Sequence, residues 1–122
     1  MKSSKAIPLG ALFSVALASS ALAHARLQAT VPAANGTVQA APASLTLDFS
    51  EGLELKLSGV KVTGPGGAAV STGTPALSPT DDKVMTVPLT GPLGPGAYTV
   101  EWHAVAKDTH ATHGAYTFTV KP

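Results

Sequence analysis

Residues 98–103 read Tyr-Thr-Val-Glu-Trp-His, and residues 116–120 read Tyr-Thr-Phe-Thr-Val. Each run alternates large apolar side chains with polar ones, which is the pattern of a β-strand that packs one face against a core. The apolar members are mostly aromatic, and Phe49 adds another aromatic side chain from an earlier run of the same kind. We therefore expect these aromatic residues to form the centre of a β-sheet core.

The same period of two extends to other parts of the chain. It is clear at residues 45–50, weaker at residues 27–31, where the odd-numbered side chains would face the core, and short at residues 60–62. Residues 84–89 alternate as well, but Pro88 lacks an amide donor. That strand is therefore expected at a sheet edge, or is expected to end at the proline.

Glycine and proline separate these runs about every ten residues. The clearest turns are Asn35-Gly36, residues 63–67 and residues 91–96, and residues 71–83 are polar and turn-rich. No segment after residue 23 shows the 3.6-residue period of an amphipathic helix. The pattern predicts an all-β fold, a single small Greek-key β-barrel or sandwich.

The first 23 residues have the three parts of a secretory signal peptide. Two lysines give a positive start, residues 7–18 are mostly apolar, and Ala21-Leu22-Ala23 matches the small-x-small cleavage pattern. The apolar run is shorter than the ~20 residues that span a bilayer. We expect cleavage after Ala23, export to the periplasm, and one mature domain, residues 24–122, that does not span the membrane.

Composition excludes several classes of site. The chain has no cysteine, so disulfides, thiolate zinc sites and blue-copper centres are all excluded. The formal net charge is +1 before the two leader lysines are removed, and no basic cluster stands out. The sequence therefore gives no sign of nucleic-acid binding.

Residues 108–114 read Asp-Thr-His-Ala-Thr-His-Gly and hold two of the four histidines. Asp108 and His110 are two residues apart, so on an extended backbone they project from one side, roughly 7 Å apart. Asp108 could be an axial oxygen ligand of a metal ion, or it could accept the proton on the His110 ring nitrogen that faces away from the metal. Taken alone, a solvated loop in which Asp108 caps its own turn is the simpler reading.

His24 becomes the N-terminal residue if cleavage follows Ala23. Its free α-amine and its ring Nδ1 could then chelate one metal ion without help from a second chain segment. Such a nitrogen pair, completed by an imidazole from elsewhere, suits the tetragonal geometry of Cu(II). We therefore expect His24 and the 108–114 stretch to form one copper site.

Three further residues are ambiguous. His113 has the opposite parity to His110 and is either a spare donor or a solvated loop residue. His103 follows Trp102 and is expected on the solvent face of its strand, in a structural role. Glu51 ends the run at residues 45–50, either as a solvated strand end or close enough to the metal to orient a ligand.

Taken together, these segments resemble the CopC copper-resistance proteins, which are periplasmic copper-binding proteins. The resemblance is carried, in one order along the whole mature chain, by residues 24–27, 47–51, 96–102, 108–110 and 114–120. It implies a cupredoxin-like (Ig-like) Greek-key barrel with a Cu(II) site at His24, Asp108 and His110, and Glu51 beside them. It also suggests a CopD-type inner-membrane copper transporter as a partner.

One departure concerns methionine. Some CopC proteins carry a methionine-rich loop that binds Cu(I), but residues 63–83 contain no methionine here, and Met85 stands alone on a strand. Because Cu(I) selects soft thioether ligands, we expect a Cu(II)-only protein.

The resulting hypothesis is a monomeric, non-enzymatic periplasmic protein that sequesters, buffers or delivers Cu(II). Two alternatives stay open. One is a small copper monooxygenase of the histidine-brace type, which the short chain and few exposed aromatics disfavour. The other is a metal-free Ig-like binding module.

Overall fold

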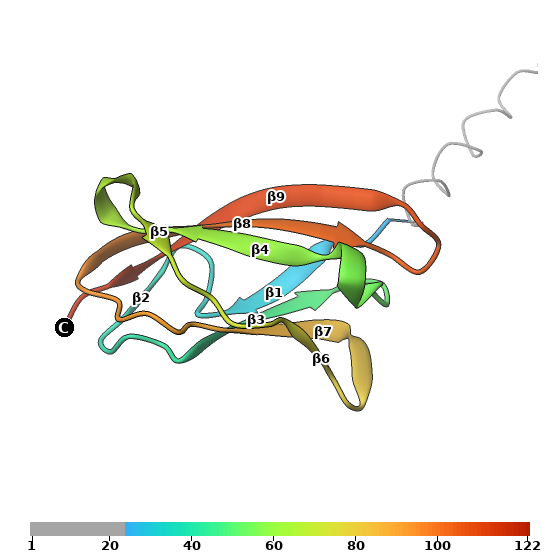
Figure 1. The fold of residues 1–122 in the computed structure, drawn as a ribbon, viewed down its shortest axis with the longest axis horizontal. Coiled ribbons are helices and arrows are strands. Elements are labelled where there is room, and N and C mark those ends of the chain that lie inside the picture. Colours follow the sequence, from blue (N-terminus) through green and yellow to red (C-terminus); the bar gives the residue numbers. More distant parts are fainter. Residues whose placement is uncertain (1–23) are drawn as a thin grey trace, which may run out of the picture.

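The computed structural model describes residues 24–122, and the expected signal peptide lies outside the described residues. The described chain is built from strands and two single-turn 3-10 helices (Figure 1). The strands are β1 (Leu27–Val31), β2 (Gly36–Val38), β3 (Ser44–Phe49), β4 (Gly59–Thr63), β5 (Ala69–Val70), β6 (Ala76–Ser78), β7 (Asp81–Pro88), β8 (Gly96–Val105) and β9 (Ala111–Val120). The 3-10 helices are η3 (Leu55–Leu57) and η4 (Pro65–Gly67). No helix in residues 24–122 has the length and apolar character needed to cross a membrane.

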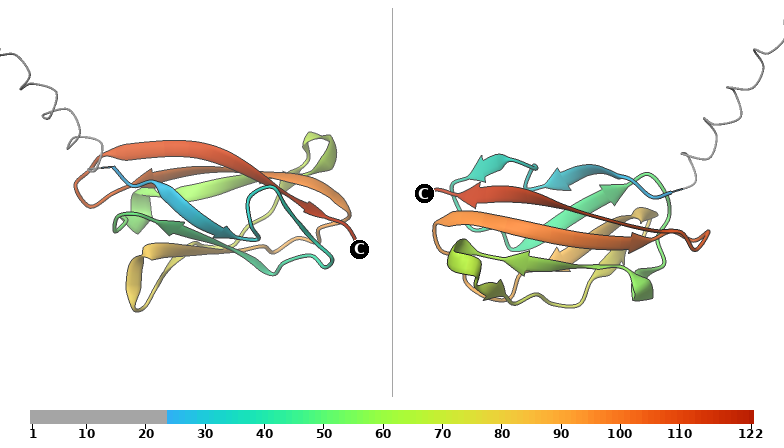
Figure 2. Two further views of the ribbon diagram at one scale, coloured as in Figure 1. Left: turned by 180° about the vertical axis from the view of Figure 1, so that it is seen from behind. Right: turned by 90° about the horizontal axis from the view of Figure 1, so that it is seen from above.

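The strands form two sheets that lie face to face (Figures 1 and 2). One sheet has the order β1-β3-β7-β6, and the other has the order β2-β9-β8-β4-β5. β2 runs parallel to β9, whereas the other pairings are antiparallel. The predicted all-β class is confirmed, in its sandwich form.

The core between the sheets contains the predicted aromatic side chains. Phe49 meets the half-buried Trp102 edge to face, with ring centroids 5.3 Å apart, and Tyr98 stacks on Phe118 at 5.4 Å. Such pairs add to the stabilisation from apolar burial. Met85 is fully buried in the same core. The Met85 side chain therefore packs in the core, as its place in the alternating pattern of β7 indicated.

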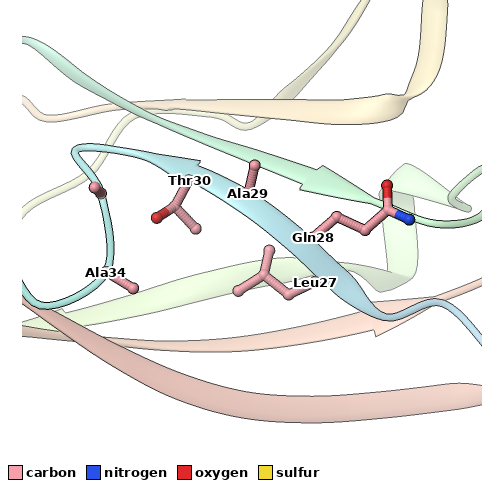
Figure 3. A pocket seen from close by; sticks show the side chains of 6 residues that line it. Leu27, Gln28, Ala29, Thr30 and Ala34 are labelled. Carbon is pink, nitrogen blue, oxygen red and sulfur yellow. The ribbon is translucent and has the colours of Figure 1, made fainter.

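β1 forms where it was expected, but the prediction of its inner face is wrong. Ala29 and Val31 are exposed, and Thr30 turns inward instead. The cause is a bulge: Leu27 pairs with Phe49, but Ala29 pairs with Asp48, so one extra residue enters β1 and reverses the alternation beyond it. Figure 3 shows the side chains of Thr30 and Leu27 on the side of β1 away from that of Ala29. An open hollow of about 320 Å³ lies against this strand and is lined by Leu27, Gln28, Ala29, Thr30, Ala33 and Ala34.

Pro88 was expected either to place its strand at a sheet edge or to end the strand. β7 lies between β3 and β6, so the first expectation is wrong. β7 ends at Pro88, so the second is confirmed. Pro88 pairs with Ser44 at the end of the β3–β7 ladder, where a missing amide costs least. The stretch at residues 71–83 contains β6 and the start of β7, which its polar composition concealed.

Candidate metal centre

The connection between β8 and β9 is a tight turn at Ala106–His110. The Thr109 amide donates to the Ala106 carbonyl at 2.8 Å, and the Ala106 amide donates to the His110 carbonyl at 3.0 Å. Thr109 has a φ of 77°, a left-handed conformation that is uncommon for a β-branched residue. The turn places Asp108 and His110 at the end of the sandwich and in solvent.

Asp108 uses both carboxylate oxygens on His110. Oδ1 accepts the His110 backbone N–H at 3.0 Å, and Oδ2 lies 3.2 Å from Nδ1 of the ring. These hydrogen bonds, the backbone one first, lower the pKa of Asp108 below its ordinary value of 3.8. Because Nδ1 faces the carboxylate, Nε2 is the nitrogen left for a metal ion, which is the usual arrangement of a ligand histidine and its carboxylate partner.

The segment that carries His24 is fastened to both sheets. Ala25 is fully buried, and its carbonyl accepts the hydroxyl of Thr112 on β9 at 2.8 Å. Ser50, at the end of β3, accepts the Arg26 amide at 2.8 Å and donates to the His24 carbonyl at 3.3 Å. The Ser50 amide also donates to the Arg26 carbonyl at 2.9 Å. These bonds fix the backbone of His24 beside the β8–β9 turn.

His24 and His110 are brought into direct contact. Their rings stack with centroids 4.6 Å apart and an angle of 24° between the planes. Both side chains are exposed, so little opposes a rotation that would point one nitrogen from each ring at a shared ion. In the stacked arrangement no group of three or more His, Asp or Glu side chains within residues 24–122 is already placed to hold a metal ion. The two rings are adjacent, and bringing both onto one ion requires a change of side-chain rotamer.

Glu51 directly follows Ser50, the residue that holds the His24 segment, and its side chain is exposed. Its backbone is therefore close to the N-terminal segment. Among residues 24–122 the Glu51 carboxylate makes no hydrogen bond or ion pair, so no contact links it to the two histidines.

His113 is not part of this cluster. It lies on the exposed face of β9, in register with His103 on β8. His103 is on the solvent face of its strand, as predicted. The structure therefore places His113 on a strand and not in the loop, and the stacked pair consists of His24 and His110.

The sequence pointed to His24 and His110 as candidate donors, which the structure brings into contact, but it did not reveal the residues that position them. Ser50, Thr112 and the buried Ala25 hold the His24 backbone, and no motif marks a serine, a threonine or an alanine for such a role. The sequence also did not reveal that His103 pairs with His113. This register of β8 on β9 depends on the length of the turn at Ala106–His110, which the sequence alone did not define.

The chain is similar to known copper-resistance proteins over almost all of its described length. The CopC domain family matches residues 27–121. Protein YobA of Escherichia coli (strain K12) is 50% identical over 99 residues, which cover 81% of this chain and 80% of YobA. Copper resistance protein C of Escherichia coli is 43% identical over 123 residues, covering 96% of each chain.

Among solved structures, PcoC of Escherichia coli, described as a methionine-rich copper resistance protein, superposes with a TM-score of 0.73 at 42% identity. The match covers 81% of this chain and all of that one. The expected cupredoxin-like sandwich is thereby confirmed. In contrast to a methionine-rich protein, this chain has only two methionines, Met85 in the core and Met1 outside the described residues. The chain belongs to the CopC family of copper resistance proteins.

Proposed function

We propose that this protein binds Cu(II) in the periplasm and holds, buffers or delivers it, through a site that forms when the signal peptide is cleaved after Ala23. The copper ion is cargo, and the protein performs no reaction on it. Copper enters and leaves by ligand exchange at an exposed chain end.

Three residues provide the donors in this proposal. The α-amine and Nδ1 of His24 chelate the ion, and Nε2 of His110 supplies a third nitrogen. These nitrogens suit the planar preference of Cu(II). Asp108 orients His110 through Nδ1, or turns to the ion as an axial oxygen, and Glu51 stands next to the site as a further carboxylate.

The observation that carries the proposal is the contact between His24 and His110. The imidazoles of His24 and His110, 86 residues apart in the sequence, meet with ring centroids at 4.6 Å. Hydrogen bonds from Ser50 and Thr112 to the carbonyls of His24 and Ala25 hold the backbone that carries the first ring. Two histidines stacked in solvent contribute little to a core. Their proximity is readily explained by a shared ligand.

The absence of a methionine cluster supports Cu(II) as the only copper ion bound. Residues 63–83 have no methionine, and the thioether of Met85 is sealed in the core. A Cu(I) site of thioethers therefore has no donors on the described surface. For delivery, the family resemblance suggests a CopD-type inner-membrane transporter, with a monomer of this protein as the donor or acceptor of copper.

The test compares the processed protein, beginning at His24, with the same protein carrying one additional alanine ahead of it. The extension keeps every side chain but moves the free amine away from His24. We expect a large loss of Cu(II) affinity in calorimetry and a changed EPR spectrum. Equal affinity and identical spectra in both forms would show that the amine is not a ligand.

The monooxygenase alternative finds no support in the site. None of the three relatives named above has a name that describes an enzyme. In the proposed site Asp108 can also turn to the ion as an axial ligand, which would occupy a position that oxygen needs. Release of soluble products from chitin or cellulose, with reductant and copper-loaded protein, would restore this alternative.

A further inference from the structure

His103 and His113 are directly opposite one another in the antiparallel β8–β9 ladder. Even-numbered residues of both strands face the core, so these two odd-numbered histidines lie together on the outer face of the five-stranded sheet. Both side chains are exposed. Directly opposed residues in such a ladder have Cβ atoms about 4.5–5.5 Å apart, a spacing from which two imidazoles can reach one ion.

We propose that His103 and His113 form a second, weaker metal site on this face, which takes a second Cu(II) ion. Histidine is the commonest metal ligand in proteins, and imidazole nitrogens suit Cu(II). The proposal rests on the proposed function only for the choice of copper as the ion. The site shares no residue with the centre at His24 and His110.

The surroundings leave room for the ion. Gly59 on β4 is the partner of His103 on its other side, and His113 has the small residues Ala111 and Ala115 two positions before and after it on the same face. A Cβ on Gly59 would lie 3.3 Å from Cε1 of His103, so the ring currently rests over the glycine. A turn of this exposed side chain from β4 toward β9 brings it to His113, and exposed side chains make such turns in picoseconds to nanoseconds.

The site should bind more weakly than the N-terminal centre because the protein supplies fewer donors. Glu101 lies on the same face, two residues from His103, but its register partners are Lys61 and Ala115. No third His, Asp or Glu completes a cluster with the two histidines in the described part of the chain. Water therefore fills the remaining coordination positions, which leaves the ion open to exchange.

The two sites are close enough to interact. His110 and His113 are three residues apart, which on an extended strand is about 10 Å. Two Cu(II) ions at this separation broaden one another's EPR signals by dipolar coupling. A second exchangeable ion beside the first would give the protein a position through which copper could pass on its way to or from the tighter site.

The experiment is a Cu(II) titration of the processed protein, with calorimetry for stoichiometry and EPR for the ligands. We expect two equivalents for the natural protein and one for His113→Asn and for His103→Asn. The matched control, His103→Asn combined with Ala97→His, restores an exposed imidazole on the same face of β8 but far along the strand from His113. It should also bind one equivalent.

The alanine-extended protein separates this proposal from the proposed function. If the second site is real, the extended form loses the tight equivalent and keeps the weak one, which His113→Asn then removes. A natural protein that binds one equivalent overturns the second site while leaving the N-terminal centre intact. So does a matched control that still binds two equivalents, because the direct pairing would then be irrelevant.

Discussion

Gly114 lies opposite Trp102 in the β8–β9 ladder, and the indole ring lies across it. A Cβ on Gly114 would be 2.7 Å from Cζ2 of Trp102, closer than real side chains pack. Gly114→Ala should therefore push the indole off its place against Phe49. Forced overpacking of this kind typically costs about 1–3 kcal/mol of unfolding free energy. Urea denaturation followed by tryptophan fluorescence measures the loss, and Trp102 is the sole tryptophan of the chain.

Gly94→Ala is the matched control for this change. Gly94 has open space where its Cβ would be, and its φ is not in the left-handed region. Its substitution should change the unfolding free energy by no more than about 0.5 kcal/mol. If both alanine variants unfold at the same urea concentration, the contact between Gly114 and Trp102 does not constrain the fold.

Asp108 gives a prediction that depends on pH. The hydrogen bonds from His110 lower the pKa of Asp108, so the folded protein favours the carboxylate form. The stability gained in this way is fully present above the ordinary pKa of 3.8 and is lost as the pH falls through the lower pKa of the folded state. From pH 7 to 5 Asp108 therefore stays ionised. We expect Cu(II) affinity to fall as the pH drops from 7 to 5. This fall must then come from protons that compete with the ion for the amine and imidazole nitrogens.

The variant Asp108→Ala tests whether the pH dependence of Cu(II) binding comes from the nitrogen ligands and not from Asp108. Loss of a carboxylate that orients a ligand histidine typically weakens metal binding by about 10–100-fold. We expect the variant to bind Cu(II) more weakly at every pH, with the same slope of log affinity against pH as the natural protein. A flat profile in the variant, measured by competition with a chelator, would show that Asp108 itself takes up the proton.

At the level of the element, alternation in the sequence predicted strands well wherever the ladder is regular. β3, β8 and β9 have the inner and outer faces that their sequences indicate. β1 does not, because a bulge depends on how two strands meet and leaves no mark in the sequence of either. The candidate site follows the same rule. His24, Asp108 and His110 carry the chemistry of metal ligands and could be proposed from the sequence, whereas the contact between the two rings also depends on hydrogen bonds from Ser50 and Thr112 to the N-terminal backbone.

The bulge in β1 should lower the stability of the fold at Thr30. Its hydroxyl is turned inward, and Oγ1 is buried with no hydrogen-bond partner among the described residues. A buried polar group without a partner costs about 1–3 kcal/mol, so Thr30→Val, which keeps the shape, should raise the unfolding free energy by about 1 kcal/mol. Thr46→Val, on the outer face of neighbouring β3, should give no comparable gain. A destabilised Thr30→Val protein would show that the hydroxyl has a partner, such as a bound water.

At the level of the whole molecule, the proposed copper site ties the first residues of the mature chain to the last hairpin. His24 is held by Ser50 from the four-stranded sheet side and, through Ala25, by Thr112 from the five-stranded sheet. An ion that joins His24 to His110 therefore links segments that separate when the sandwich unfolds. Because the unfolded chain brings these donors together only rarely, copper should bind the folded protein far more tightly and stabilise it.

The expected gain in stability on copper binding follows from the linkage between binding and folding. At a free Cu(II) concentration 100 times Kd, a ligand specific for the native state adds about 2.7 kcal/mol, which for a domain of this size corresponds to a rise in Tm of roughly 10–20 °C. Thermal unfolding of the processed protein at pH 7, with and without Cu(II), measures it. The rise should shrink at pH 5 and nearly disappear in the alanine-extended protein. An equal rise in the extended protein would mean that copper stabilises the fold from another site, and that His24 is not the residue joining the two ends of the chain.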